Sequence, residues 1–150
     1  MNYWLLKSEP SVFGIDHLAK VRSSIWDGVR NYQARNYLRT AQLEDVAFFY
    51  HSNCPETGIA GLCSVVEAGL DDPTQFDKKS PYFDPKSTKA APRWQTVRVA
   101  FARKFARVLT LDELKISFSG DELAVVRKGM RLSVMPVSEQ SAQKLLAMLM

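Results

Sequence analysis

The sequence has little cysteine and no long apolar run. Its 150 residues contain only two cysteines, Cys54 and Cys63, which is too few for a disulfide scaffold and suits a reducing compartment. No stretch approaches the ~20 apolar residues that a membrane span needs. The first residues lack the basic leader and cleavage site of a secretory signal. We therefore expect a protein without a membrane partner, in the cytoplasm or in the nucleus of a host that has one.

The common catalytic and phosphate-binding signatures are also absent. There is no G-x-G-x-x-G, G-x-x-x-x-G-K-[ST], G-x-S-x-G or H-E-x-x-H motif, which argues against nucleotide hydrolysis, Rossmann oxidoreduction and the commonest hydrolases. His51, Cys54 and Cys63 lack a fourth obvious metal ligand. His51 is either a general base with an acidic partner or a strand-end histidine bonded to the backbone. We expect no cofactor, no metal and no catalytic residue.

Composition and charge indicate one globular domain with a basic bias. The chain is 46% apolar and carries a net charge of +4. Residues 1–40 hold six Lys and Arg against three acids, residues 41–89 four against eight, and residues 90–150 ten against five. If the two basic ends meet in space, they form a positive face that favours nucleic acid. The alternative is the mildly basic surface of an ordinary soluble protein.

The periodicity of apolar residues predicts an α+β domain. Strands are expected at 3–8, 46–52, 58–68, 96–105 and 130–138, and helices at 14–21, at 30–40, after Thr110 and after Ser138. Gly58 and Gly61 suggest a bulge or the close approach of a second backbone. Strands scattered among helices, without regular βαβ alternation, favour a mixed, curled sheet or a small barrel.

Residues 69–93 fit neither period and contain four prolines. Loops longer than ~12–15 residues are uncommon in compact domains and are often functional. This loop carries Tyr82 and Phe83 in its middle and is followed by Trp94. We expect it to be a binding loop or a lid.

The stretch "WDGVRNYQARN" at 26–36 puts a tryptophan beside an Asp-Gly turn. Trp26 either anchors the following helix in the core or forms one wall of a pocket that the neighbouring amides and arginines serve. An aromatic face near basic and amide groups can stack on a nucleobase, which contributes ~1–3 kcal/mol per base. Trp4, inside an apolar strand, is expected in the core.

Several of these segments together resemble the EVE domain. The resemblance rests on "YWLLKSEP" at 3–10, "WDGVRNYQARN" at 26–36, "FFYHSN" at 48–53, "DPTQFD" at 72–77, "YFDPKS" at 82–87, "PRW" at 92–94 and "RLSVMPVS" at 131–138. That family is related to the PUA-like fold and to the YTH readers of N6-methyladenine in RNA. The resemblance runs through nearly the whole chain in the right order. It implies a single EVE domain over 1–150, a PUA-like mixed β-barrel with flanking short helices.

The resemblance also implies a function and a site. The expected function is non-enzymatic binding of a flipped, modified base, with modified cytosine favoured, in DNA or RNA, by a monomer. The base pocket is expected to hold Lys7, Ser8, Glu9, Trp26, Asp27, Asn31, Tyr32, His51, Ser52, Asn53, Arg131 and Ser133, with Tyr82, Phe83 and Trp94 closing it from the long loop. The candidate phosphate contacts are Arg30, Arg35, Arg39 and Arg93.

Two positions depart from the pattern of relatives. YTH readers have Asn where this chain has Glu9, and a carboxylate accepts hydrogen bonds from N–H groups, which suits an exocyclic amine. Ala142 stands where relatives have a tryptophan, which we interpret as a packing change. Two other functions remain open: an enzyme that acts on a modified nucleotide or base through His51 with Glu9 or Asp27, and a binder of a small metabolite or a protein in the same pocket.

Overall fold

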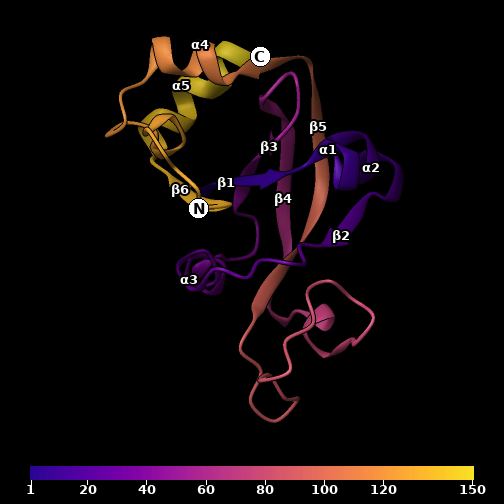
Figure 1. Cartoon of the computed structure of the whole chain (residues 1–150). Helices are drawn as coiled ribbons and strands as arrows, with labels where there is room; N and C mark the ends of the chain where they lie inside the picture. The colour runs from indigo at the N-terminus through magenta and orange to yellow at the C-terminus, as the bar shows by residue number, and fades with distance from the viewer.

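A computed structural model describes residues 1–150 and shows one mixed six-stranded sheet in the order β2-β5-β4-β3-β1-β6 (Figure 1). The strands are β1 (Tyr3–Ser8), β2 (Ser23–Ile25), β3 (Val46–His51), β4 (Gly58–Asp71), β5 (Gln95–Thr110) and β6 (Val134–Val137). Strand β1 runs parallel to β3 and antiparallel to β6, and the other neighbours are antiparallel. The predicted mixed α+β architecture is confirmed. Closure into a barrel stays a prediction, since no hydrogen-bonded pair joins β2 to β6.

Strands β4 and β5 are longer than their apolar patterns predict. The added residues of β5 include Leu109, which is fully buried and pairs with Ile59. Those of β4 reach Asp71, which pairs with Gln95. Their register shifts at several points, one of them between Ile59 and Gly61. A Cβ added at Gly61 would lie 2.4 Å from the carbonyl oxygen of Arg103 and 2.7 Å from the Ile15 side chain. The expected bulge and close backbone approach are therefore confirmed at Gly61.

Short helices fill the connections between the strands. They are α1 (Pro10–Phe13), α2 (Ile15–Val21), α3 (Tyr32–Thr40), α4 (Leu111–Ser117) and α5 (Glu139–Leu149), with the 3₁₀ helices η1 (Pro73–Phe76) and η2 (Ala124–Val126). The predicted caps are confirmed: Thr110 accepts a hydrogen bond from Glu113 N, and Ser138 accepts one from Ser141 N. Helix α1 and strand β2 were not predicted, because three or four residues are too few to show a period.

Apolar side chains pack on both faces of the sheet. Strand β1 shows the alternation, since Trp4 and Leu6 join the core that contains Trp26, whereas Leu5 joins the core under α4 and α5. Trp4 is thus in the core, as expected. Ala142 lies on the inner side of α5 and is fully buried in the second core. Residues 72–94 extend away from the sheet at the end opposite α4 and α5 (Figure 1). None of the helices is both long and apolar enough to cross a membrane.

A buried carboxylate ties the start of β1 to the start of β3. Asp45 is fully buried and accepts hydrogen bonds from the Trp4 indole N–H and from the backbone N–H groups of Asn2 and Gln42, each at 2.9 Å. Burial alone would raise the pKa of Asp45, but these donors outweigh it and lower the pKa. The ionised form is therefore part of the folded structure.

We expect Asp45→Ala to lower the free energy of unfolding by about 3 kcal/mol near pH 7, because it leaves buried donors without an acceptor. The folded pKa lies below the unfolded value of roughly 3.9, so the contribution is complete above that value and is lost as pH falls through the folded pKa. Urea unfolding of both proteins across pH 3 to 7 should show a gap that narrows in acid. A constant gap would contradict the ionic role.

Candidate functional site

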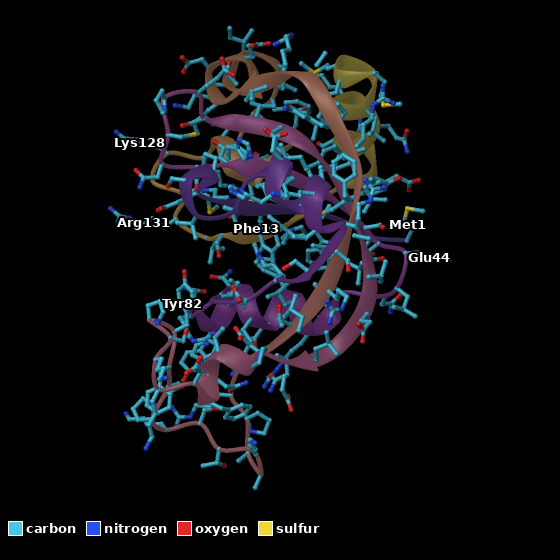
Figure 2. All side chains as sticks on the ribbon, turned by 90° about the vertical axis from the view of Figure 1, so that its right-hand side faces the viewer. Met1, Phe13, Glu44, Tyr82, Lys128 and Arg131 are labelled. Carbon is cyan, nitrogen blue, oxygen red and sulfur yellow. The ribbon has the colours of Figure 1, made fainter.

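A cavity of about 770 Å³ opens between the carboxyl end of β1, helix α1, the segment from β2 to α3, and residues 131–133. Figure 2 shows Phe13 in the opening, with Arg131 and Tyr82 on opposite edges. The cavity is lined by Lys7, Ser8, Glu9, Val12, Phe13, Ser24, Ile25, Trp26, Asp27, Gly28, Val29, Arg30, Asn31, Ser52, Tyr82, Arg131 and Ser133. Residues from five distant segments therefore share one concave surface.

Trp26 fits both roles that its sequence context left open, that of a core anchor and that of a pocket wall. Its side chain is 6% exposed and packs edge-to-face on Phe49, with ring centroids 5.3 Å apart. Its backbone is held to β5, because its N–H donates to Val97 O at 2.9 Å and its carbonyl accepts from the Thr96 hydroxyl. The same residue lines the cavity. Trp26 is therefore a core residue whose remaining surface forms the wall of the cavity.

The Asp-Gly turn after Trp26 is the place where the long loop reaches the cavity. Gly28 has φ +82°, and a Cβ there would lie 2.7 Å from the Tyr82 ring. Only glycine combines that backbone conformation with such a close aromatic neighbour. Tyr82 stays 37% exposed and forms the outer edge of the opening.

A buried ion pair holds the loop in this position. Asp72 is 2% exposed and accepts from Gly28 N at 2.8 Å, from the Arg30 guanidinium at 3.0 Å and from Thr74 N at 2.8 Å. Arg30 also donates to the Tyr82 carbonyl at 2.9 Å. The guanidinium that we expected to contact phosphate is thus committed to an internal carboxylate. Sequence reasoning missed Asp72, although an Asp before Pro73 is a recognisable helix cap.

Tyr32 and Trp94, both expected in the pocket, stack on each other outside it. Their ring centroids lie 4.8 Å apart at 17°, with the guanidinium of Arg35 over Tyr32 at 4.7 Å and that of Arg30 over Trp94 at 5.1 Å. The Trp94 indole N–H donates to Asp84 at 2.7 Å. The guanidinium of Arg35 also lies 5.8 Å from the Trp94 ring, so it sits beside the two rings. The stack joins α3 to the long loop, and neither ring lines the cavity.

The remaining predicted phosphate contacts lie around the same stack. Arg35 donates to the carbonyl of Arg93 at 2.8 Å, and Arg93 reaches the Tyr32 hydroxyl at 3.4 Å. Arg39 donates to the side chain of Gln95. Phe83 is half-buried and does not line the cavity either. The roles of Arg35, Arg39 and Arg93 in phosphate binding stay predictions.

His51 and Asn53 support the cavity from behind. The Nε2 atom of His51 accepts the Ile15 N–H at 3.1 Å, and burial lowers the pKa of the imidazole. Asn53 donates to the Glu9 carboxylate at 3.1 Å. The geometry matches the backbone-bonded histidine, because the nitrogen that a general base would use already accepts a bond at the start of α2.

The cavity combines hydrogen-bond acceptors with donors. The Asp27 carboxylate has no side-chain partner, and its pKa is raised, mainly by burial at the wall and further by repulsion from Asp72. The Lys7 ammonium lies 3.4 Å from the Met130 carbonyl, and burial lowers its pKa. Ser8, Ser52 and Ser133 add hydroxyl groups. Such a site can hydrogen-bond a polar heterocycle on two edges while its aromatic wall covers a face.

Comparisons with known proteins agree with this geometry. Residues 2–148 match the EVE domain. The chain belongs to the EVE domain family. Mouse thymocyte nuclear protein 1 is 40% identical over an alignment of 165 positions. The alignment covers 98% of this chain and 73% of that protein. The expected family is therefore confirmed.

Solved structures extend the likeness. A protein from Pseudomonas putida superposes with a TM-score of 0.95 at 47% identity, covering 99% of each chain. Human THYN1 protein in complex with DNA containing 5-methylcytosine gives a TM-score of 0.89 at 39% identity, over 99% of this chain and 97% of that chain. A YTH domain-containing protein in complex with RNA, at 10% identity and a TM-score of 0.55, shares the fold alone.

The structure therefore gathers most of the expected pocket residues and sets others aside. The expected members that lie outside the cavity are Tyr32, His51, Asn53, Phe83 and Trp94, whereas the others line it. The wall also includes Val12, Phe13, Ser24, Ile25, Gly28 and Val29, which the sequence did not single out. The proline at the start of α1 was the available signal for the first two, because proline favours the first turn of a helix.

Because Asp72 is buried against Arg30, we expect Asp72→Ala to lower the free energy of unfolding by about 3 kcal/mol by leaving the guanidinium unpaired. Hydrogen exchange of residues 72–94 should accelerate at the same time. The matched control is Glu67→Ala, which breaks the exposed pair with Arg98 and should cost about 1 kcal/mol or less. Equal effects of the two variants would show that Asp72 does not hold the loop.

His51 predicts a pH effect at the start of α2. Its folded pKa lies below the unfolded value of about 6.5, so its contribution to stability is complete above that pH and is lost as pH falls through the folded pKa. His51→Gln, with a side chain that accepts but does not titrate, should flatten the loss of stability below pH 6.5. Thermal unfolding at several pH values measures this, and identical pH profiles would refute it.

Proposed function

We propose that this protein is a non-enzymatic module that binds one modified base, a modified cytosine, from DNA or RNA in the cavity beside Trp26. The observation that carries the proposal is the cavity itself, which places an aromatic wall next to the Asp27 carboxylate, which has no side-chain partner, and the Lys7 ammonium. The human relative in complex with 5-methylcytosine DNA, at 39% identity, supports the same class of ligand.

Shape and apolar surface suit a single extruded base. Extrusion costs a few kcal/mol of unstacking, which the protein must recover by stacking and edge contacts. Trp26 supplies an aromatic wall, and the side chains of Val12, Phe13 and Ile25 offer apolar surface beside it. A methyl group at the 5-position of cytosine gains about 0.8 kcal/mol when such surface removes it from water.

The polar groups match the edge of cytosine. Cytosine presents an N4 amino donor, whereas its ring nitrogen and carbonyl oxygen accept. The Asp27 carboxylate, with Glu9 at the rim, is suited to accept from the amino group. The Lys7 ammonium and the hydroxyls of Ser52 and Ser133 are suited to donate to the acceptors, whereas the Ser8 hydroxyl already donates to the Phe13 carbonyl. A carboxylate would instead repel the O4 acceptor of thymine.

The proposed binder needs no catalytic group. His51, the one candidate for a general base, accepts the Ile15 N–H and does not line the cavity. Our proposal extends to a monomer that reads one base and to a cytoplasmic location, which stays a prediction. The mouse relative carries a name that calls it nuclear.

The test is a fluorescence titration with matched short oligonucleotides that differ only in cytosine 5-methylation or adenine N6-methylation. We expect a preference of tenfold or more for 5-methylcytosine, equal to about 1.4 kcal/mol, in the wild type. Asp27→Asn should weaken that binding about tenfold, because a neutral amide oxygen is a weaker acceptor for the cytosine amino group than a carboxylate. Trp26→Ala is not a clean test, because Trp26 also fills the core.

The matched control is Asp112→Asn, which removes the same charge from an exposed position in α4, outside the cavity. It should bind like the wild type. Equal affinity for modified and unmodified strands would refute base reading. Turnover of a modified nucleoside by the wild type would refute the non-enzymatic assignment.

A further inference from the structure

A second concave surface adjoins the base cavity, and its chemistry points to the strand that carries the base. This surface, called here the basic groove, has a volume of about 690 Å³ and lies between α3, β6 and the segment that joins η2 to β6. Its cationic members are Arg127, Lys128 and Arg131, and Gln33 and Tyr37 face them from α3. None of these residues was expected to bind phosphate.

The two hollows share a wall. Arg131 lines both, while Ser133 lines the base cavity and Leu132 lines the basic groove. Lys7, inside the base cavity, donates to the carbonyl of Met130, which lines the basic groove. On the facing side Asn31 lines the first hollow and Gln33 the second. The two hollows therefore meet at Arg131, and only two to three residues of each segment lie between them.

The cations of the basic groove are not neutralised inside the protein. The ion pairs of the chain involve Arg30, Arg98, Lys104 and Arg107, and none of the three groove cations. Arg127, Lys128 and Arg131 are all exposed, and the Arg127 guanidinium donates only to the Gly120 carbonyl, at 2.8 Å. Figure 2 shows Lys128 and Arg131 projecting from the same side of the molecule as the opening of the cavity.

The turn that carries Lys128 is open at its tip. Met130 N donates to Arg127 O at 3.2 Å, Gly129 has φ +73°, and no atom lies within 4 Å of a Cβ added there. Asp121 and Glu122 line the groove as well. The Glu122 carboxylate accepts a hydrogen bond from Ser119 N at 2.8 Å. Neither acid forms an ion pair with Lys128 or Arg131, so these two cations are free to bind an anion.

We propose that the basic groove binds the phosphodiester backbone of the nucleotides next to the base held in the cavity. This inference rests on the proposed function and adds the path of the strand, from the cavity over Arg131 to Lys128. Arginine and lysine that neutralise phosphates release counterions, which makes binding salt-dependent without reading sequence. The predicted contacts Arg30 and Arg35 are instead engaged by the long loop.

The test compares an oligonucleotide with a free nucleoside, 5-methylcytidine. Arg127→Ala combined with Lys128→Ala should bind the 5-methylcytosine oligonucleotide at least tenfold more weakly at low salt and leave nucleoside binding unchanged. The slope of log affinity against log salt should fall by about 1.4 to 1.8, the value for two lost phosphate contacts. Lys128→Glu, which keeps the Arg127 bond to Gly120, should act in the same direction.

The control is Lys20→Ala with Lys115→Ala, which removes two exposed charges that line neither hollow. An unchanged salt slope in both groove variants would overturn the inference even if base reading holds. A reduced slope in the groove variants, together with a wild type that does not distinguish methylated from unmethylated cytosine, would support the groove and refute the proposed function. Absence of oligonucleotide binding by the wild type would overturn both.

Discussion

The site depends on one buried carboxylate. Asp72 joins the turn after Trp26 to the long loop through Gly28 N and the Arg30 guanidinium, across more than 40 residues of sequence. Arg30, oriented by Asp72, also donates to the Tyr82 carbonyl, so the same ion pair places Tyr82 over Gly28. The Tyr32–Trp94 stack then ties the far side of the loop to α3. The cavity therefore lies between the carboxyl end of β1 and a long loop that the Arg30–Asp72 ion pair holds in place.

The core and the site overlap because some residues belong to both. Trp26 stacks edge-to-face on Phe49 and so takes its orientation from the core of the sheet. Groups that bind a ligand well are those whose own positions are held by packing and hydrogen bonds. The polar members of the cavity are supported in this way too, since Asn53 holds Glu9 and the Met130 carbonyl holds Lys7. His51 contributes by capping α2 and not by chemistry.

Arginines and lysines that look alike in the sequence have different partners in the fold. Arg30 and Arg35 are used to fasten the long loop, whereas Arg127, Lys128 and Arg131 are left without an ionic partner beside the cavity. The cations of the basic groove all come from the segment before β6, and α3 contributes the uncharged side chains of Gln33 and Tyr37. The proposed base cavity and the proposed backbone groove share Arg131 as a common lining residue.

The sequence by itself determined the features that short-range pattern controls. The strand at 3–8, the caps at Thr110 and Ser138 and the family were all readable, because alternation, capping and ordered motifs act over a few residues. Only the tertiary structure decided which side chains face the cavity. His51 and Ile15 are 36 residues apart, and Gly28 and Asp72 are 44 apart. Hydrogen bonds over such separations leave no local periodicity, so Tyr32, Trp94 and Arg30 could be assigned only when their partners were in place.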